Sequence, residues 1–211
     1  CAAAKLAPTS SALVCVLWAH FLRIPVRMDI SKILAIAYRL VGGLVDVIST
    51  CGWLKAALAA MELAPMLKQG LVPSANPLLQ LPFFDEARVA RALNEFQVED
   101  VFDLLAMEAS RRDSLLADLT AEQVSIVAHK CNQFPEIGLS LSTGDPESLT
   151  VSLSNLSQTC GWWLVLGCED QLVDIKRVSN QEQVVMRKEA STNKLYFMCD
   201  TFIGCDQEED L

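Results

Sequence analysis

The sequence has no Cys-x-x-Cys pair and only two histidines, His20 and His129, among its 211 residues. A structural zinc site needs four cysteine or histidine ligands, usually in close pairs, and this spacing does not supply them. There is also no G-x-x-x-x-G-K-[ST] loop to cradle a nucleotide phosphate and no Gly-x-Ser-x-Gly elbow to present a nucleophile. From the residues alone we therefore identify no catalytic residue, no cofactor site and no metal site.

The remaining chemical candidates have plainer interpretations. The string Leu81-Pro-Phe-Phe-Asp-Glu-Ala-Arg88 resembles a magnesium-binding helicase box, but Pro82 disfavours a buried strand before it, so a helix start with acids at its N-terminus is expected. His129 and Cys131 are two residues apart on one predicted helix, so they do not face each other as a dyad. His20, between Ala19 and Phe21, is expected to be a packed histidine.

Composition places the chain among folded proteins. Hydrophobic residues make up 52% of it, the mean hydropathy is +0.30 and the net charge is −9. These values exclude a disordered tail, a collagen and a coiled coil. The negative charge argues against a surface that binds nucleic acid all over. The chain begins at Cys1 and not at a methionine, so we expect it to be part of a longer protein.

Two apolar stretches raise the question of a membrane. The run Leu6 to Leu22 contains Pro8 and several polar residues and lacks a signal-peptidase site after it. The run Ile30 to Ile48 is interrupted by Lys32, Arg39 and Asp46. We therefore expect no membrane span.

The eight cysteines stand singly along the chain. Isolated cysteines in a chain of this size usually behave as small buried apolar residues in a reducing compartment. A disulfide between Cys199 and Cys205 is the less favoured alternative.

Charge divides the chain into three segments. Residues 1–70 carry seven basic and three acidic residues, residues 71–135 carry five and ten, and residues 136–211 carry five and thirteen. Proline and glycine cluster near 70–77 and near Pro135, where such residues commonly mark boundaries. The first segment is thus the only basic one.

The periodicity of apolar residues changes along these segments. Helical spacing predicts a helix from an Asp29 N-cap to about Ser49 and another from Trp53 to Gln69, kinked or divided by Pro65. Short helices follow over 85–96, 100–107 and 120–132, the last opened by the capping box Thr120-Ala-Glu-Gln123. Period-two alternation and short apolar runs then predict strands near 137–142, 149–154, 161–167, 172–178, 183–188 and 194–198.

We therefore predict an α+β multidomain chain: a helical bundle over 1–80, a helix-loop-helix domain over 81–135, and an all-β immunoglobulin-like or fibronectin type III-like sandwich over 136–211. Lys32, Arg39 and Asp46 are seven residues apart and share one stripe of the first long helix. Gly42 and Gly43 lie beside that stripe and indicate a close approach to the backbone. Lys32 and Arg39 are the candidate nucleic-acid contacts, because lysine and arginine can bind the phosphates of a single strand.

Several strings together resemble a known family. They are Val45-Asp-Val-Ile-Ser-Thr-Cys-Gly-Trp-Leu54, Ala57-Leu-Ala-Ala-Met-Glu-Leu63, Leu81-Pro-Phe-Phe84, Val101-Phe-Asp-Leu104, Gly161-Trp-Trp163, Ile175-Lys-Arg177, Leu195-Tyr-Phe-Met-Cys-Asp200 and Ile203-Gly-Cys-Asp-Gln207. This set is similar to the Sec-sixty-three-type module that follows the helicase core in Ski-like RNA helicases, and most similar to that of the second, C-terminal cassette in spliceosomal members. The resemblance covers nearly the whole chain.

The resemblance implies the same three domains and a nuclear, non-catalytic module that binds proteins and regulates a helicase in pre-mRNA splicing. Its partners would be the rest of the helicase chain and spliceosomal proteins, with RNA contact only through the bundle and no membrane. ATP and Mg²⁺ would belong to the parent helicase, not to this chain. In the family a long bundle helix lies along the single strand, which would make Lys32 and Arg39 the strand-facing residues.

Two other functions remain open. One is a strand-guiding module of an active Ski-like helicase of the coactivator or meiotic type. The other is the cytosolic domain of the endoplasmic-reticulum translocation subunit, whose C-terminal region has a similar form. The chain departs from the family in its short connections between 26 and 29, 156 and 161, and 189 and 194. Its 76-residue sandwich is also shorter than the usual length of about 100 residues.

Overall fold

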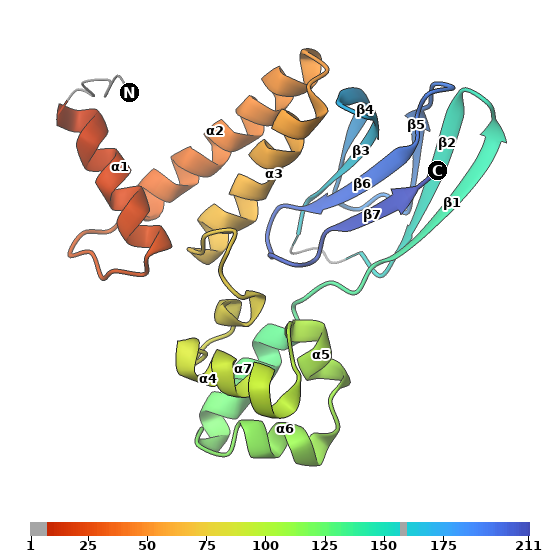
Figure 1. Cartoon of the computed structure of the whole chain (residues 1–211). Coiled ribbons are helices and arrows are strands. Elements are labelled where there is room, and N and C mark those ends of the chain that lie inside the picture. The colour runs from red at the N-terminus through yellow and green to blue at the C-terminus, as the bar shows by residue number, and fades with distance from the viewer. Residues whose placement is uncertain (1–7, 157–159) are drawn as a thin grey trace.

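The computed structural model describes residues 8–156 and 160–211. Helices come first and strands last, so the chain is α+β (Figure 1). The helical elements are α1 (Pro8–Phe21), α2 (Ser31–Thr50), α3 (Leu54–Gln69), the 3-10 turn η1 (Pro77–Gln80), α4 (Glu86–Arg91), the π-helical turn η2 (Ala92–Phe96), α5 (Val101–Ala106), α6 (Ala109–Leu115) and α7 (Ala121–Cys131). The strands are β1 (Gly138–Asp145), β2 (Ser148–Ser154), β3 (Trp162–Cys168), β4 (Gln171–Val178), β5 (Gln183–Arg187), β6 (Lys194–Cys199) and β7 (Gln207–Asp210).

The long helix α2 matches the predicted one, with two corrections. Its N-cap is Ile30 and not Asp29, because the first backbone bond of the helix runs from the Leu34 N–H to the Ile30 carbonyl at 3.0 Å. The carboxylate of Asp29, one residue before the cap, still accepts from the Ser31 N–H. A Cβ added to Gly42 or Gly43 would meet no atom within 4 Å. No group among residues 8–156 and 160–211 therefore packs closely against the backbone at these two glycines, although their presence had suggested such a contact.

Helix α3 runs unbroken through Pro65, so the predicted division is wrong. A proline removes one backbone donor and crowds the carbonyl four residues earlier, but here the residues around it are buried and hold the helix together. The helix ends at Gly70, which adopts a left-handed conformation (φ +61°) and donates its N–H to the Met66 carbonyl at 2.8 Å. A glycine at this position is the common way for a helix to end.

The short helices between α3 and the strands begin where their caps predict. Asp85, Asp100 and Thr120 each accept a backbone N–H three residues later, at 2.8, 2.9 and 3.2 Å. The Thr120 cap is a complete capping box, because the Gln123 side chain accepts from the Thr120 N–H in return. Helix α6 and the turn η1 were not predicted.

Seven strands form two antiparallel sheets. One sheet has the order β1-β2-β5 and the other has the order β4-β3-β6-β7. Six of these strands agree with the predicted ones within a few residues. Strand β7 was missed because its sequence, Gln-Glu-Glu-Asp, has no apolar residue to mark it.

The central strand β3 determines how the layers stack. Six of its seven residues are buried, because one face lies inside the sandwich and the other lies against α2 and α3. Trp162 and Leu164 belong to the core shared by the sandwich and the short helices, whereas Trp163 and Val165 belong to a second core with α2 and α3. Neither core stays within one of the predicted domains.

The open space at Gly43 gives a simple stability prediction. The variant Gly43→Ala should raise the free energy of unfolding by about 0.5–1 kcal/mol, because alanine loses less backbone entropy in a helix and its methyl group meets nothing here. Urea unfolding followed by circular dichroism measures this. A loss of stability would show that a contact outside the described residues uses this backbone.

Candidate functional site

A single buried carboxylate connects the long helices with the sandwich. The side chain of Asp200, at the end of β6, is only 4% exposed. It accepts a hydrogen bond from the Tyr38 hydroxyl of α2 at 2.6 Å and from the Lys68 ammonium of α3 at 3.1 Å. The guanidinium of Arg177, from β4, completes an ion pair with it. Two helices and two strands thus converge on the same two oxygen atoms.

These contacts keep the carboxylate charged. Burial alone would raise the pKa of Asp200, but hydrogen bonds from Thr201 and Tyr38, the charge of Lys68 and the Gly161 N–H at 2.9 Å together hold that pKa below its ordinary value. Burial and the same carboxylate raise the pKa of the Tyr38 hydroxyl, so it remains a proton donor. A buried charge supplied with this many donors is a stable structural element and not an acid poised for catalysis.

Gly161 makes room for this ion pair. A Cβ at position 161 would lie 2.5 Å from an Asp200 carboxylate oxygen and 2.7 Å from the Arg177 guanidinium. Arg177 also lies over the ring of Trp163, 3.9 Å from the ring centre, where a cation is attracted to the aromatic face. Gly161, Trp163, Arg177 and Asp200 come from three separate sequence strings, and the fold brings all of them to one place.

A second polar contact joins the turn η1, at the end of the first part of the chain, to the sandwich. The buried side-chain amide of Gln80 donates to the Ile203 carbonyl at 2.9 Å and accepts from the Ile203 N–H at 2.8 Å. Close by, the rings of Phe134 and Phe202 pack with their centres 4.2 Å apart. All three parts of the chain are therefore joined through the sandwich.

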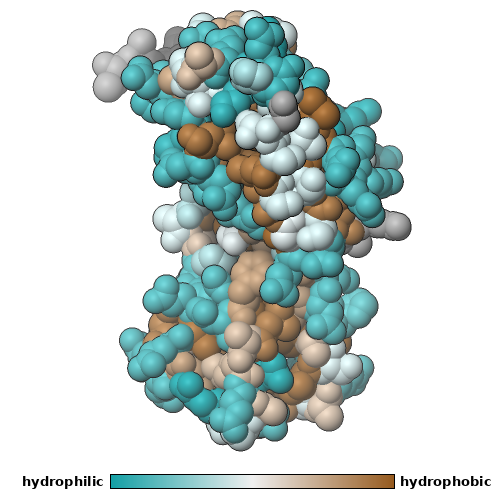
Figure 2. Space-filling view, turned by 90° about the vertical axis from the view of Figure 1, so that its right-hand side faces the viewer, coloured by the Kyte–Doolittle hydropathy of each residue, from teal (hydrophilic) through white to brown (hydrophobic). Residues whose placement is uncertain are grey.

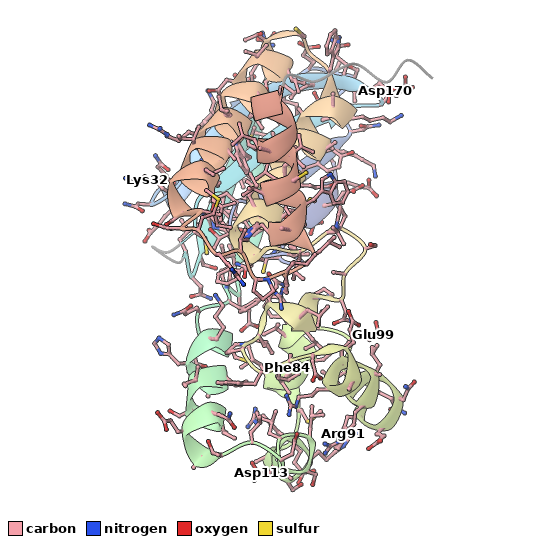
Figure 3. The ribbon with its side chains drawn as sticks, turned by 90° about the vertical axis from the view of Figure 1, so that its left-hand side faces the viewer. Lys32, Phe84, Arg91, Glu99, Asp113 and Asp170 are labelled. Atoms are coloured by element: carbon pink, nitrogen blue, oxygen red, sulfur yellow. The ribbon has the colours of Figure 1, made fainter. Side chains whose placement is uncertain are left out.

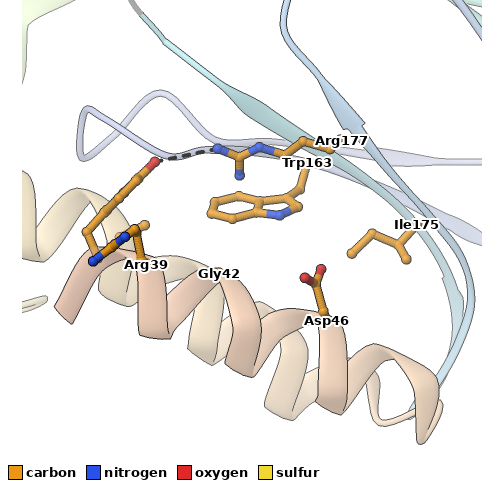
Figure 4. A pocket seen from close by; sticks show the side chains of 8 residues that line it. Arg39, Gly42, Asp46, Trp163, Ile175 and Arg177 are labelled. Carbon is orange, nitrogen blue, oxygen red and sulfur yellow. Dashed lines mark hydrogen bonds between the residues drawn. The ribbon is translucent and has the colours of Figure 1, made fainter. Parts of the chain in front are cut away.

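A groove of about 420 Å³ lies next to the Asp200 cluster, between α2 and the sheet (Figure 4). Arg39, Gly42 and Asp46 line its helical wall. Trp163 and Arg177 line the opposite wall. The groove combines two arginines, one aspartate and an open stretch of helix backbone, which suits a polar or anionic segment better than an apolar one.

Both predicted strand-facing residues are accessible. Lys32 is exposed near the start of α2 and points away from the body of the protein (Figure 3). Arg39 is exposed on the helical wall of the groove, across from the sandwich (Figure 4). Neither side chain makes a hydrogen bond or ion pair with residues 8–156 or 160–211. The structure does not bring the two residues into one cluster, because they are two helical turns apart.

The short helices carry arginines that are already engaged. Arg88 bonds the Phe83 carbonyl and the Asp118 carboxylate. The other arginines, Arg91, Arg111 and Arg112, donate to backbone carbonyls near helix ends, those of Ser114, Phe96, Leu104 and Leu105. These side chains therefore hold α4 to α6 together and leave few free cations for a phosphate backbone.

The other sequence candidates take structural roles. The His20 ring is bonded to the Leu67 carbonyl at 2.8 Å, so it helps to hold α1 against the end of α3. Cys131 is buried, and burial raises its pKa to about 11, so it is a poor nucleophile beside His129. Cys199 and Cys205 are buried thiols and not a disulfide. The described residues contain no group of three or more His, Cys, Asp or Glu that could hold a metal ion.

An apolar surface remains uncovered on α1 and α2. Leu40 is 68% exposed and Val47 is 63% exposed, although both lie in the apolar run that predicted the helix. Their exposed apolar neighbours on the same two helices are Leu13, Val14, Trp18, Ile36 and Leu44. We call these seven residues the α1–α2 apolar face. By length and composition alone α2 could cross a membrane, yet a helix that packs on other protein passes the same test.

Together these features define a module of helices and a β-sandwich whose parts are joined by a buried ion cluster. The family model of the Sec63 Brl domain matches residues 7–211, so the chain belongs to that family.

Similar proteins include helicases from several organisms. The chain is 35% identical to the human U5 small nuclear ribonucleoprotein 200 kDa helicase over 86% of its own length. It is 36% identical to the Arabidopsis thaliana DExH-box ATP-dependent RNA helicase DExH12 over 91%, and 28% identical to the Dictyostelium discoideum activating signal cointegrator 1 complex subunit 3-like protein over 91%. The matched region covers only 10–11% of these relatives.

The Asp200 cluster predicts a pH-dependent stability. The variant Asp200→Asn should lower the free energy of unfolding at pH 7 by roughly 3 kcal/mol, because Lys68 and Arg177 lose their counter-charge. Since the folded-state pKa of Asp200 is lowered, its stabilisation is present above a pH of about 4 and is lost as the pH falls through the folded value. The variant should therefore show less acid destabilisation in urea titrations at pH 7, 5 and 3.

The matched control is Asp170→Asn. Asp170 pairs with Lys55 across the same junction between α3 and the sandwich, but both side chains are more than 70% exposed. That variant should change stability by less than about 0.5 kcal/mol. Equal losses for the two variants would show that the Asp200 cluster has no special role.

Proposed function

We propose that this chain is the non-catalytic C-terminal module of a spliceosomal type of RNA helicase. In this role it acts in the nucleus as a protein-interaction and regulatory platform in pre-mRNA splicing. The observation that carries the proposal is the α1–α2 apolar face, because seven large apolar side chains exposed on two helices favour burial against further protein. Family membership and the named relatives make the rest of a helicase chain the natural cover. The parent chain would supply ATP binding, Mg²⁺ and catalysis.

The charge distribution supports protein contacts over nucleic-acid contacts in the two C-terminal parts. Residues 71–135 have a net charge of −5, from five basic and ten acidic residues, and residues 136–211 have a net charge of −8, from five and thirteen. Because four arginines of the short helices are occupied by carbonyls and carboxylates, they add little attraction for phosphate. Spliceosomal proteins are therefore the expected partners of these parts.

We also propose the division into a helical bundle (1–80), a helix-loop-helix domain (81–135) and an immunoglobulin-like or fibronectin type III-like sandwich (136–211). The order of elements and the pairing of three strands against four support it. The contacts of Gln80 with Ile203 and of Phe134 with Phe202 indicate that the three parts act as one unit.

A second function is carried by a separate observation. Lys32 and Arg39 are exposed, lack partners within the described residues, and lie on the one basic segment of the chain. This supports a strand-guiding role along α2, with Arg39 at the mouth of the groove. The alternative of an endoplasmic-reticulum translocation subunit has less support, because the human, Arabidopsis and Dictyostelium relatives are named as helicases or as a cointegrator subunit.

The contact with a helicase core can be tested by introducing the same two substitutions into the 211-residue chain and into the full-length protein. Leu40→Lys with Val47→Lys should change the stability of the 211-residue chain by less than about 0.5 kcal/mol, because both side chains are exposed there. In the full-length protein the same changes should lower the melting temperature, since they would bury two charges. Differential scanning fluorimetry measures both.

An equal change of melting temperature in the 211-residue chain and in the full-length protein would contradict the proposed contact. The change Ile24→Lys is a control from the loop between α1 and α2, where an exposed apolar residue lies outside the α1–α2 apolar face. Hydrolysis of ATP by the 211-residue chain alone would contradict the non-catalytic role.

The strand-guiding function predicts that removing Lys32 and Arg39 lowers the affinity for RNA. In the full-length protein, Lys32→Ala with Arg39→Ala should weaken binding to a single-stranded RNA and reduce the slope of log affinity against log salt by up to about two, one unit for each phosphate contact. Fluorescence anisotropy at several salt concentrations measures this. Arg91→Ala, in which a carbonyl-bound arginine of the short helices is removed, is the matched control and should leave the slope unchanged. An unchanged slope for the double variant would remove this function.

A further inference from the structure

The two sheets of the sandwich meet along two seams, and one of them is closed. At the seam between β4 and β5, the Arg187 N–H donates to the Asp174 carboxylate at 2.8 Å. The Arg187 guanidinium donates to the Val173 carbonyl at 3.1 Å. These bonds occupy groups at the edges of both strands, so no further strand can add there.

The other seam lies between β1 and β7, which are the remaining end strands of the two sheets. At one end the Gln207 side chain donates to the Ile137 carbonyl at 3.1 Å. Strand β7 is protected in the way that natural edge strands often are: it has four residues, and three are acidic. Glu209 pairs in register with the buried Leu195, so it lies on the inner side of the sheet, where a charge discourages a further strand.

Strand β1 lacks these protections over its first six residues, and its one acidic residue, Asp145, lies at the far end after a register shift. It pairs only with β2, spans eight residues, and has no charged residue or proline from Gly138 to Thr143. Leu141 pairs with the fully buried Val151, so it lies on the inner side, yet it is 36% exposed. A long, uncharged edge with a partly covered leucine favours the addition of another strand.

The outer surface beside this edge is also uncharged. Ser140 pairs with Ser152 and Ser142 pairs with Thr150, which forms a strip of small hydroxyl residues on a part of the chain whose net charge is −8. Figure 2 shows pale residues, neither strongly hydrophilic nor strongly hydrophobic, gathered on the sandwich half of the face that it displays. An incoming strand therefore has no charged side chain to displace there.

We propose that the edge of β1 is a docking site for an extended segment of a partner protein in which apolar and basic side chains alternate. The segment would add as a fourth strand beside β1, placing apolar side chains over Leu141 and basic ones toward the acidic strand β7. In β7, Glu208 and Asp210 already pair with Lys194, so Glu209 on the inner side is the main attraction for a basic side chain. This inference rests on the proposed function as a protein-interaction platform, and it names the surface and the class of partner.

Charge decides between a partner and a second copy of the chain. Two copies that paired edge to edge through β1 would bring together two sandwiches of net charge −8 and two acidic β7 strands. Like charges at that distance oppose association, whereas a basic segment is attracted. The partner segment is therefore the favoured occupant.

The experiment uses a defined probe. A soluble peptide of about ten alternating valine and lysine residues, long enough to cover the strand, is titrated into the 211-residue chain by calorimetry. Hydrogen exchange then shows which backbone amides become protected. We expect protection in 138–145, and we expect no comparable binding from a valine–glutamate peptide or from the valine–lysine peptide with a central proline, which cannot complete the ladder.

Variants of the chain separate the edge from general charge attraction. Leu141→Lys should weaken binding of the valine–lysine peptide roughly tenfold, because it places a charge where the new strand must pack. Val185→Lys is the matched control, because it adds the same charge at a different place on the same sheet. Val185 is 61% exposed on β5, which lies at the opposite end of that sheet from β1. The proline-containing peptide leaves the chain unchanged, so the test holds even if Leu141→Lys folds poorly.

Several results would overturn the site. They are equal weakening by Val185→Lys, binding of the proline-containing peptide with full affinity, protection only at β7, and a dimer of the chain that Leu141→Lys dissociates. None of these results would affect the contact of α1 and α2 with a helicase core, which the Leu40 and Val47 variants test separately.

Discussion

The arrangement of this module depends on the carboxylate of Asp200. Helices α2 and α3 lie on the outer face of the four-stranded sheet, and Asp200 is the point where both helices bond to that sheet. A buried charge would be costly without partners, but here it has donors from Tyr38, Lys68, Arg177 and the Gly161 backbone. Because these donors are directional, the charge fixes the position of the helices on the sheet more closely than apolar packing alone would.

Burial of β3 on both faces explains which side of α2 is covered among the described residues. The inner side of α2 is used against α3 and the sheet through residues such as Val41 and Val45. The remaining apolar side chains, on the α1–α2 apolar face, stay 40–68% exposed. The high hydrophobic content of the sequence therefore reflects two internal cores and one surface for further protein.

Much of the fold could be predicted from the sequence, because its signals are local. Helical spacing located the helices that start at Asp85 and Asp100, the capping box located the one at Thr120, and alternation with short apolar runs located six strands. Prediction failed where neighbours far along the chain decide the outcome: buried packing keeps α3 whole at Pro65, and β7 forms because it pairs with β6. The candidate site was the least predictable part. Lys32 and Arg39 follow from helical spacing, but nothing in one sequence pairs Tyr38 with Asp200 across 162 positions.

The most direct test of the role of Asp200 is a double-mutant cycle between Tyr38→Phe and Asp200→Asn, with free energies of unfolding from urea titrations followed by tryptophan fluorescence. Trp163 lies beside the cluster and reports on it. If the carboxylate joins α2 to the sandwich, the two changes should be non-additive by about 1 kcal/mol or more. Additive effects would mean that the bond between Tyr38 and Asp200 does not hold α2 on the sheet, and would contradict the role of the buried carboxylate in joining α2 to the sandwich.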